Sequence, residues 1–168
     1  MHVKREEGTT LYMPCFTEIY SGTKIVSTYP DNIKKNIATI QGTMILNNNK
    51  TGEILSIMNG AAITAYRTGA VGGVGIRYTT RSDCQSVGLV GKGVQGYYQL
   101  LYACAARDIT NVYIFGTATE KAIKFKQKLE DALQGIHIHL ESNLNTLVKK
   151  SDIIITATPS EKPVLPDD

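Results

Sequence analysis

The sequence predicts an α/β protein in which an antiparallel β portion is followed by an incomplete parallel sheet with helices on both faces. Three observations support this fold class. The first 58 residues contain short β-branched and apolar runs that are separated by turn residues. From Ser86 onward, apolar strands alternate with helical patterns, which is typical of a parallel sheet. A G-x-G-x-x-G pattern joins the first strand and the first helix of this second part.

Two domains are predicted. The first, residues 1–80, is β-rich and ends in a linking helix at 59–78, and the second, residues 81–168, carries the alternating pattern. The boundary is placed at the polar segment 79–85.

The first portion contains four predicted strands, at Thr9–Met13, Thr23–Tyr29, Ala38–Leu46 and Ile54–Met58. Turn-forming residues separate them at 21–22, 30–32 and 47–52. The last of these connections joins two strands directly, which indicates a hairpin.

Asn59 is a suitable N-cap for the helix that follows, which is expected to run to about Tyr78. Four glycines lie inside this helix: Gly69, Gly72, Gly73 and Gly75. Each costs about 0.8–1 kcal/mol relative to alanine, so some feature must require the missing side chains. Close packing against another element and close approach of a ligand both explain them, and packing is favoured for the later glycines.

The second portion has the predicted order strand 86–90, helix 94–107, strand 112–115, helix 119–133, strand 136–140, helix 143–149 and strand 152–157. Gly135 is expected to cap the second of these helices at its C-terminus. Apolar strands that alternate with helices form a parallel sheet, here cut after its fourth strand.

The glycine pattern lies at residues 91–96, between a strand and a helix. In dinucleotide-binding proteins of the Rossmann type, Gly91 would make the turn, Gly93 would let a pyrophosphate approach the backbone, and Gly96 would let the helix pack on the strand. The free N–H groups at the helix N-terminus would then face the phosphates. An ordinary glycine turn is the alternative, and the strand–turn–helix context favours the nucleotide site.

The second strand of this portion lacks the acidic residue that binds the adenosine ribose in NAD enzymes, because Gly116 stands at its place. Without that carboxylate a 2′-phosphate is not repelled. Thr117 and Thr119 offer hydroxyls to such a phosphate, and Lys121 offers a charge. The expected cofactor is therefore NAD or NADP, with a slight preference for NADP.

Composition and charge argue against nucleic-acid binding, a membrane segment and a metal site. The chain has 168 residues and a net charge of +3 with no Lys/Arg-rich run, which does not predict a nucleic-acid surface. It has no signal peptide and no long apolar segment, so a soluble, cytoplasmic protein without membrane contact is expected. The three cysteines lack metal-ligand spacing, and no metal site is predicted.

Five segments carry a resemblance to a known family: residues 11–14 (LYMP), 22–32 (GTKIVSTYPDN), 64–70 (TAYRTGA), 91–95 (GKGVQ) and 151–160 (SDIIITATPS). Together they resemble the ornithine cyclodeaminase/mu-crystallin family over essentially the whole chain. The resemblance implies a β-rich portion that binds substrate and forms a homodimer, followed by a Rossmann domain. It also implies a nicotinamide cofactor and a small amino-acid or imino-acid substrate.

Family roles are carried over by position. The resemblance implies that Lys24 and Arg67 are catalytic and substrate-binding residues. Lys24 matches a lysine that contacts the substrate carboxylate near the reacting carbon, and Arg67 matches an arginine that clamps the same carboxylate beside the cofactor. From the resemblance and the glycine pattern, the predicted cofactor contacts are Thr39, Arg67, Thr68, Gly91, Gly93, Val94, Gln95, Gly96, Gly116, Thr117 and Thr158. The alternatives are a surface lysine on a strand for Lys24 and a helix-surface ion pair for Arg67.

The resemblance makes ornithine cyclodeamination the leading expectation. Hydride leaves Cα of L-ornithine, the side-chain amine attacks the imine, ammonia leaves, and the returned hydride gives L-proline. Alanine dehydrogenase, ketimine reductase and opine-type or siderophore-precursor dehydrogenase are alternatives within the family. A non-catalytic, mu-crystallin-like binder of NADP and small ligands is the alternative from another class.

Two further family residues have no counterpart here. A substrate-binding arginine would precede residue 1, and the acid/base aspartate of cyclodeaminases would follow residue 168, with neither Asp167 nor Asp168 in its place. The chain is therefore expected to be a fragment with little activity of its own. An exposed strand edge at 152–157 predicts poor solubility or swapped assembly.

Overall fold

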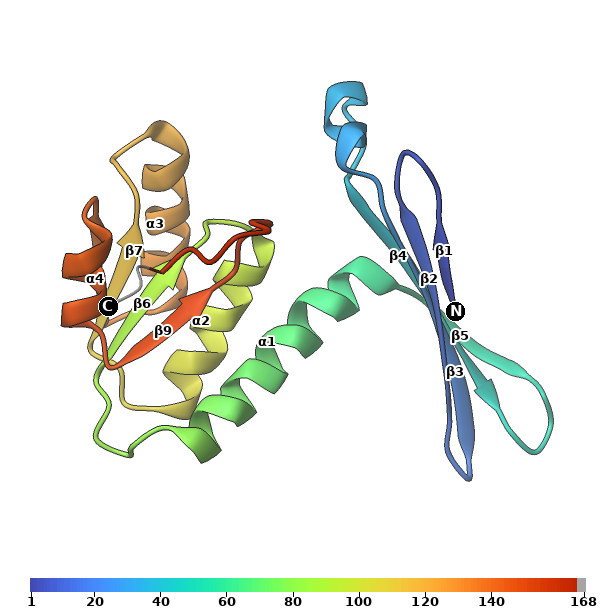
Figure 1. The fold of residues 1–168 in the computed structure, drawn as a ribbon. Helices are drawn as coiled ribbons and strands as arrows, with labels where there is room; N and C mark the ends of the chain where they lie inside the picture. Colours follow the sequence, from blue (N-terminus) through green and yellow to red (C-terminus); the bar gives the residue numbers. More distant parts are fainter. Residues whose placement is uncertain (166–168) are drawn as a thin grey trace. The chain divides into compact units, whose positions relative to one another are not determined.

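A computed structural model describes residues 1–165 of the chain. The chain divides into two compact units, one of Met1–Thr64 and one that begins at Ala65 (Figure 1). The division falls inside the first long helix rather than in the polar segment 79–85. From Ala65 on, the helix belongs to the second unit, where Gly69 and Gly73 pack closely on the segment of Tyr98–Tyr102.

The first unit is a single antiparallel sheet in the order β1-β2-β3-β4-β5 (Figure 1). Its elements are β1 (His2–Lys4), β2 (Thr9–Phe16), β3 (Tyr20–Thr28), the 3₁₀ helix η1 (Pro30–Lys35), β4 (Ile40–Asn48) and β5 (Ile54–Asn59). The four predicted strands are confirmed, with ends that shift by up to three residues. Strand β1 was not predicted, because three residues are too few to show an alternating pattern.

The first unit buries little of its apolar surface. Among its described residues, Val26 on β3 is the only buried hydrophobic side chain. Large exposed apolar side chains occur along all the longer strands and the connections between them: Tyr12, Met13, Phe16, Ile19, Tyr20, Ile33, Ile37, Ile40, Ile54, Leu55 and Ile57. Because strand neighbours such as Tyr12 and Met13 point to opposite faces, the exposed apolar side chains lie on both faces of the sheet.

Helix α1 (Gly60–Thr79) starts at the predicted cap. The side-chain oxygen of Asn59 accepts hydrogen bonds from the backbone N–H groups of Ala61 and Ala62, both at 3.0 Å. At the other end, the Arg107 guanidinium donates to the carbonyl oxygens of Arg77 and Thr80 at 2.7 and 2.8 Å. A cation that satisfies the last carbonyls stabilises a helix C-terminus.

The glycines of α1 are explained by packing. A Cβ at Gly69 would lie 2.8 Å from the carbonyl oxygen of Tyr98, and a Cβ at Gly73 would lie 2.9 Å from the carbonyl oxygen of Tyr102. A Cβ at Gly72 would overlap the side chain of Gln99. The packing explanation is therefore confirmed at these three positions. Gly75 faces open space, so packing does not explain it.

The second unit is a four-stranded parallel sheet in the order β8-β7-β6-β9 (Figure 1). Its elements are β6 (Ser86–Val90), α2 (Val94–Ala106), β7 (Asn111–Phe115), α3 (Glu120–Ala132), β8 (His137–Glu141), α4 (Leu144–Lys150) and β9 (Ile153–Thr156). All seven agree with prediction within one or two residues. The strand order is that of half a Rossmann fold, and β6 lies at the switch point where ligands bind in such sheets.

Both faces of the parallel sheet are covered, as predicted. Val87 and Leu89 point to one face, where they are fully buried together with Leu100 of α2 and Leu129 of α3. On the other face, a Cβ at Gly88 would collide with Leu147 of α4.

The glycine predicted to end α3 has a different place. The helix is capped at Leu133, whose N–H bonds the Leu129 carbonyl. Gly135 adopts a φ of +84° in the turn toward β8, which is a conformation that glycine adopts without strain.

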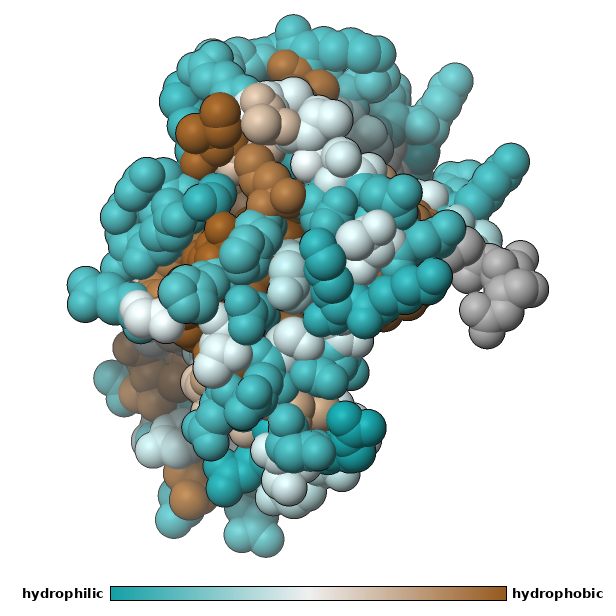
Figure 2. Space-filling view, turned by 90° about the vertical axis from the view of Figure 1, so that its left-hand side faces the viewer, coloured by the Kyte–Doolittle hydropathy of each residue, from teal (hydrophilic) through white to brown (hydrophobic). Residues whose placement is uncertain are grey.

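The surface of the second unit differs from that of the first. Figure 2 shows its α4 side, where mainly hydrophilic side chains surround smaller hydrophobic patches. Outside α1, the described residues of this unit expose only Val94 and Ile123 among large hydrophobics. No helix within residues 1–165 has both the length and the apolar character that a membrane crossing requires.

Candidate functional site

The glycine loop is shaped by contacts that exclude side chains. Gly91 has a φ of +119°, and a Cβ there would overlap the carbonyl oxygen of Ala157, just after β9. A Cβ at Gly96 would overlap the carbonyl oxygen of Gly91 and lie 3.3 Å from Leu89. These two glycines therefore let the loop turn tightly and let α2 start directly against β6.

Gly93 is different, because no heavy atom lies within 4 Å of a Cβ built on it. It is the N-cap of α2, and no side chain caps the helix there. The first N–H groups of α2 thus face space that a small anion can enter. Two residues on, the side-chain oxygen of Gln95 is buried and has no partner among the described residues. An open cradle beside an unpaired polar atom fits a dinucleotide.

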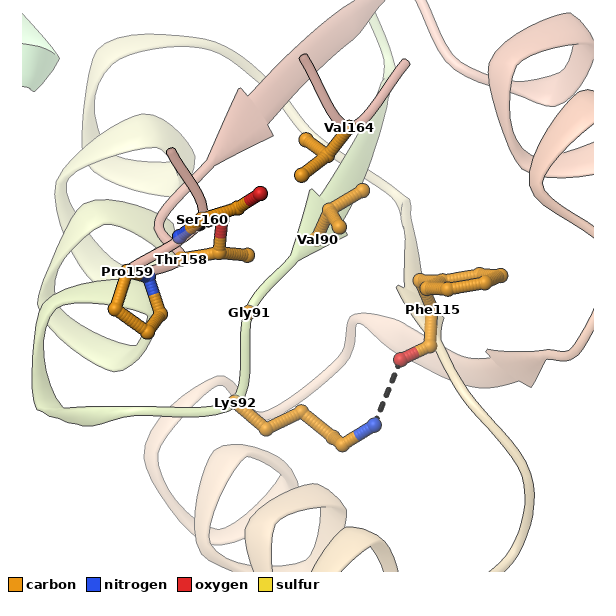
Figure 3. Close-up of a pocket in the computed structure, with 8 residues that line it drawn as sticks. All are labelled: Val90, Gly91, Lys92, Phe115, Thr158, Pro159, Ser160 and Val164. Atoms are coloured by element: carbon orange, nitrogen blue, oxygen red, sulfur yellow. Dashed lines mark hydrogen bonds between the residues drawn. The ribbon is translucent and has the colours of Figure 1, made fainter. Parts of the chain in front are cut away.

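A pocket of about 540 Å³ lies at the carboxyl ends of β6, β7 and β9 (Figure 3). It is lined by Val90, Gly91, Lys92, Phe115, Thr158, Pro159, Ser160 and Val164. The volume is within the usual range of small-molecule sites. The structure thus brings the predicted residues Gly91 and Thr158 to one cavity, although they are 67 positions apart in the chain.

Lys92 was missed by the sequence analysis. Its ammonium group reaches from the glycine loop to the end of β7 and donates to the Phe115 carbonyl at 2.8 Å (Figure 3). Next to that carbonyl, Gly116 has a φ of +137°, and a Cβ there would overlap the Lys92 ammonium. The absence of an acidic side chain at 116 therefore has a local cause. Thr117, one residue further, is exposed.

The predicted substrate lysine is held by tertiary contacts. Lys24 is half-buried on β3, directly across from Met13 on β2 and Met44 on β4. Its ammonium donates to the hydroxyl of Thr64 at 3.1 Å, and this hydroxyl donates to the Gly60 carbonyl at 2.6 Å. These contacts argue against a merely solvated lysine, and the role of Lys24 in binding substrate stays a prediction.

Arg67 lies on α1 three residues after Thr64, so the two side chains occupy neighbouring positions on the same helix face. The Arg67 side chain is exposed and has no hydrogen bond or ion pair within residues 1–165. The alternative of a helix-surface ion pair therefore finds no partner in that part of the chain. Beside it, the carbonyl of Thr68 accepts a hydrogen bond from the Gln99 side chain at 3.0 Å.

The remaining predicted residues divide between the units. Thr39 lies in the first unit just before β4, where its carbonyl accepts from the Tyr29 N–H at 2.8 Å. Val94 is exposed at the start of α2, in the second unit. Both stay predictions as cofactor contacts. Asp167 and Asp168 lie outside the described residues.

Two side chains of the second unit with shifted pKa values lie outside the pocket. Burial raises the pKa of the Cys104 thiol to about 11, and hydrogen bonds from Ser86 lower the pKa of Asp152. Neither group lines the pocket. In the described part of the chain, no three His, Cys, Asp or Glu side chains gather to hold a metal ion.

Comparisons with known proteins agree with this geometry. The family model of the ornithine cyclodeaminase/mu-crystallin family matches residues 1–168. A Δ¹-pyrroline-2-carboxylate reductase from Thermococcus litoralis, solved with NADH and L-proline, has a TM-score of 0.90 and 36% identity over 98% of this chain and 52% of that one. An archaeal alanine dehydrogenase dimer with bound NAD has a TM-score of 0.88 and 33% identity over 98% and 50%.

A lysine cyclodeaminase is also similar, with a TM-score of 0.86 and 27% identity over 100% of this chain and 50% of that one. The chain spans about half the length of the curated relatives it matches, such as an alanine dehydrogenase from Archaeoglobus fulgidus that is 33% identical over 98% of this chain and 50% of the relative. The family model covers every residue, and the fold agrees with the solved relatives. This chain therefore belongs to the ornithine cyclodeaminase/mu-crystallin family.

Proposed function

We propose that this chain binds a nicotinamide dinucleotide and serves an oxidoreductase that acts on a small amino or imino acid. The observation that carries the proposal is the open backbone at Gly93, at the start of α2 and next to the pocket. The pyrophosphate would rest on the Gly91–Gly96 loop, with Gln95, Thr158 and the 116–117 turn around the rest of the cofactor. Bound there, the nicotinamide supplies or accepts hydride.

Lys24 and Arg67 are the proposed substrate ligands. Both would bind the carboxylate, Arg67 through its planar guanidinium and Lys24 as a point charge. The hydrogen bond to Thr64 supports this role, because it holds the Lys24 ammonium at the first turn of α1. Arg67 follows one turn later on the same face, with its guanidinium available. Together, the two cations would orient the carbon beside the carboxylate for hydride transfer.

Reduction of a cyclic imino acid is the reaction we favour. Hydride adds to the imine carbon and a proton adds to nitrogen, which gives a cyclic amino acid. The relative solved with NADH and L-proline, at 36% identity, supports this choice. The alanine dehydrogenase, at 33% identity, supports oxidative deamination as the second candidate. Ornithine cyclodeamination, the leading expectation from sequence, has weaker support from the lysine cyclodeaminase at 27%.

We also propose that a second copy of this chain covers the sheet of the first unit. Its exposed apolar side chains, with only Val26 buried, support an interface of this kind. The alanine dehydrogenase relative is a dimer, which supports the same assembly.

The proposed function is tested by titrating the purified chain with NADH and with NADPH. The chain has no tryptophan, so the fluorescence of the reduced nicotinamide itself reports binding. Gly93→Asp is the test variant, and we expect it to abolish binding of both cofactors, because it places a carboxylate against the phosphates.

Because a Cβ at Gly93 meets nothing within 4 Å, this variant should unfold at the same temperature as the wild-type chain. Undiminished binding in a folded Gly93→Asp chain would disprove the cofactor site. If cofactor binds, Δ¹-pyrroline-2-carboxylate, pyruvate with ammonia, and L-ornithine are then compared as substrates. Net consumption of NAD(P)H with the cyclic imine would support reduction, whereas turnover of ornithine without net cofactor change would support cyclodeamination.

A further inference from the structure

Lys92 lies between two glycines of the loop, and its side chain extends to the end of the neighbouring strand β7. Its ammonium donates to the carbonyl of Phe115, the last residue of β7, at 2.8 Å (Figure 3). In dinucleotide-binding folds the end of this second strand holds the adenosine ribose, where an acidic residue binds the 2′-hydroxyl in NAD enzymes. In this chain a fixed positive charge lies at the position where a negative one is usual.

Within residues 1–165, no ion pair compensates this charge. None of the residues that line the pocket with Lys92 is acidic. Glu120, at the start of α3, is an exposed residue whose carboxylate pairs with Lys124 at 2.6 Å. The Phe115 carbonyl is a neutral acceptor, which orients the ammonium and leaves its other two N–H groups for a ligand.

The backbone of Gly116 and the side chain of Lys92 lie in close contact. The backbone of Gly116 has a φ of +137°, which side chains other than glycine rarely adopt, and a Cβ there would overlap the ammonium. The glycine therefore does more than omit a carboxylate, because it also makes the room that the lysine occupies. Any side chain at 116 would need a strained backbone and would displace the Lys92 ammonium from its present position.

We propose that Lys92 binds the 2′-phosphate of NADP(H), so that the preference for the phosphorylated cofactor is set from the glycine loop. The inference rests on the proposed function and adds to it the residue that chooses the cofactor. It separates this chain from the two relatives that were solved with NADH and with NAD. It also assigns the role to Lys92 rather than to Lys121, the exposed lysine of α3.

The test compares Lys92→Met with two matched variants, Lys121→Met and Lys124→Met, each of which also removes one positive charge. Calorimetric titrations with NADPH, NADH, adenosine 2′,5′-bisphosphate and 5′-AMP give the dissociation constants. The last two probes differ only in the 2′-phosphate, so their comparison isolates this group from the nicotinamide half.

We expect the wild-type chain to bind NADPH more tightly than NADH. Lys92→Met should weaken NADPH and the bisphosphate about 10- to 100-fold, as expected for loss of a charged hydrogen bond, and should change NADH and 5′-AMP by less than about threefold. Both matched variants should behave like the wild-type chain. Raised salt should weaken the bisphosphate more than 5′-AMP.

Three results would overturn the inference while leaving the proposed function intact. These are tighter binding of NADH than of NADPH, equal weakening of both cofactors by Lys92→Met, and a loss of NADPH binding confined to Lys121→Met. Absence of binding by either cofactor in the wild-type chain would instead refute the proposed function, and the inference with it.

Discussion

The close packing of α1 on α2 predicts different effects on the free energy of unfolding for alanine at Gly73 and at Gly75, two glycines of the same helix. Alanine at Gly75 meets open space, so Gly75→Ala should raise the free energy of unfolding by about 0.8–1 kcal/mol through helix propensity. Alanine at Gly73 gains the same propensity but presses against the backbone of α2 at Tyr102. Overpacking of this kind costs about 1–3 kcal/mol.

Gly73→Ala should therefore be less stable than Gly75→Ala by about 1–3 kcal/mol, because only the packing differs between them. For a chain of this size, that corresponds to about 2–12 °C in melting temperature. Urea unfolding followed by circular dichroism measures both variants, and similar helical signals before unfolding serve as the control. Equal stabilisation by the two substitutions would refute the close crossing of α1 over α2.

Two further predictions concern pH and substrate. Hydrogen bonds from the Ser86 side chain and from the Gln85 backbone lower the pKa of Asp152 below its usual 3.8, so its contribution to stability is present above that pKa and lost as pH falls through the lowered one. The urea concentration at half unfolding should therefore decrease as the pH is lowered below about 4, and it should decrease less steeply in Asp152→Asn. The same pH dependence in both proteins below about pH 4 would contradict this prediction. Lys24→Met and Arg67→Met should each weaken L-proline binding to the NADH-bound chain by about 10- to 100-fold in calorimetry, and unchanged affinity would reject the carboxylate role.

The sequence by itself determined the parts of the fold that depend on local pattern. The alternation of strands and helices from Ser86 onward and the cap at Asn59 follow from residue order, because periodicity and capping act over a few positions. The glycine loop and the family resemblance were also predicted from the sequence, because both depend on short runs of residues. Strand β1 was not, because so short a run shows no period.

Only the tertiary structure decided which distant residues meet. It showed that glycines of α1 make room for α2, that Thr158 shares a pocket with Gly91, and that Lys24 bonds to Thr64. Sequence showed that an acid was missing at 116, whereas the fold showed the Lys92 ammonium in its place. Contacts between strands and helices far apart in the chain depend on how the layers pack, and no local pattern records the packing.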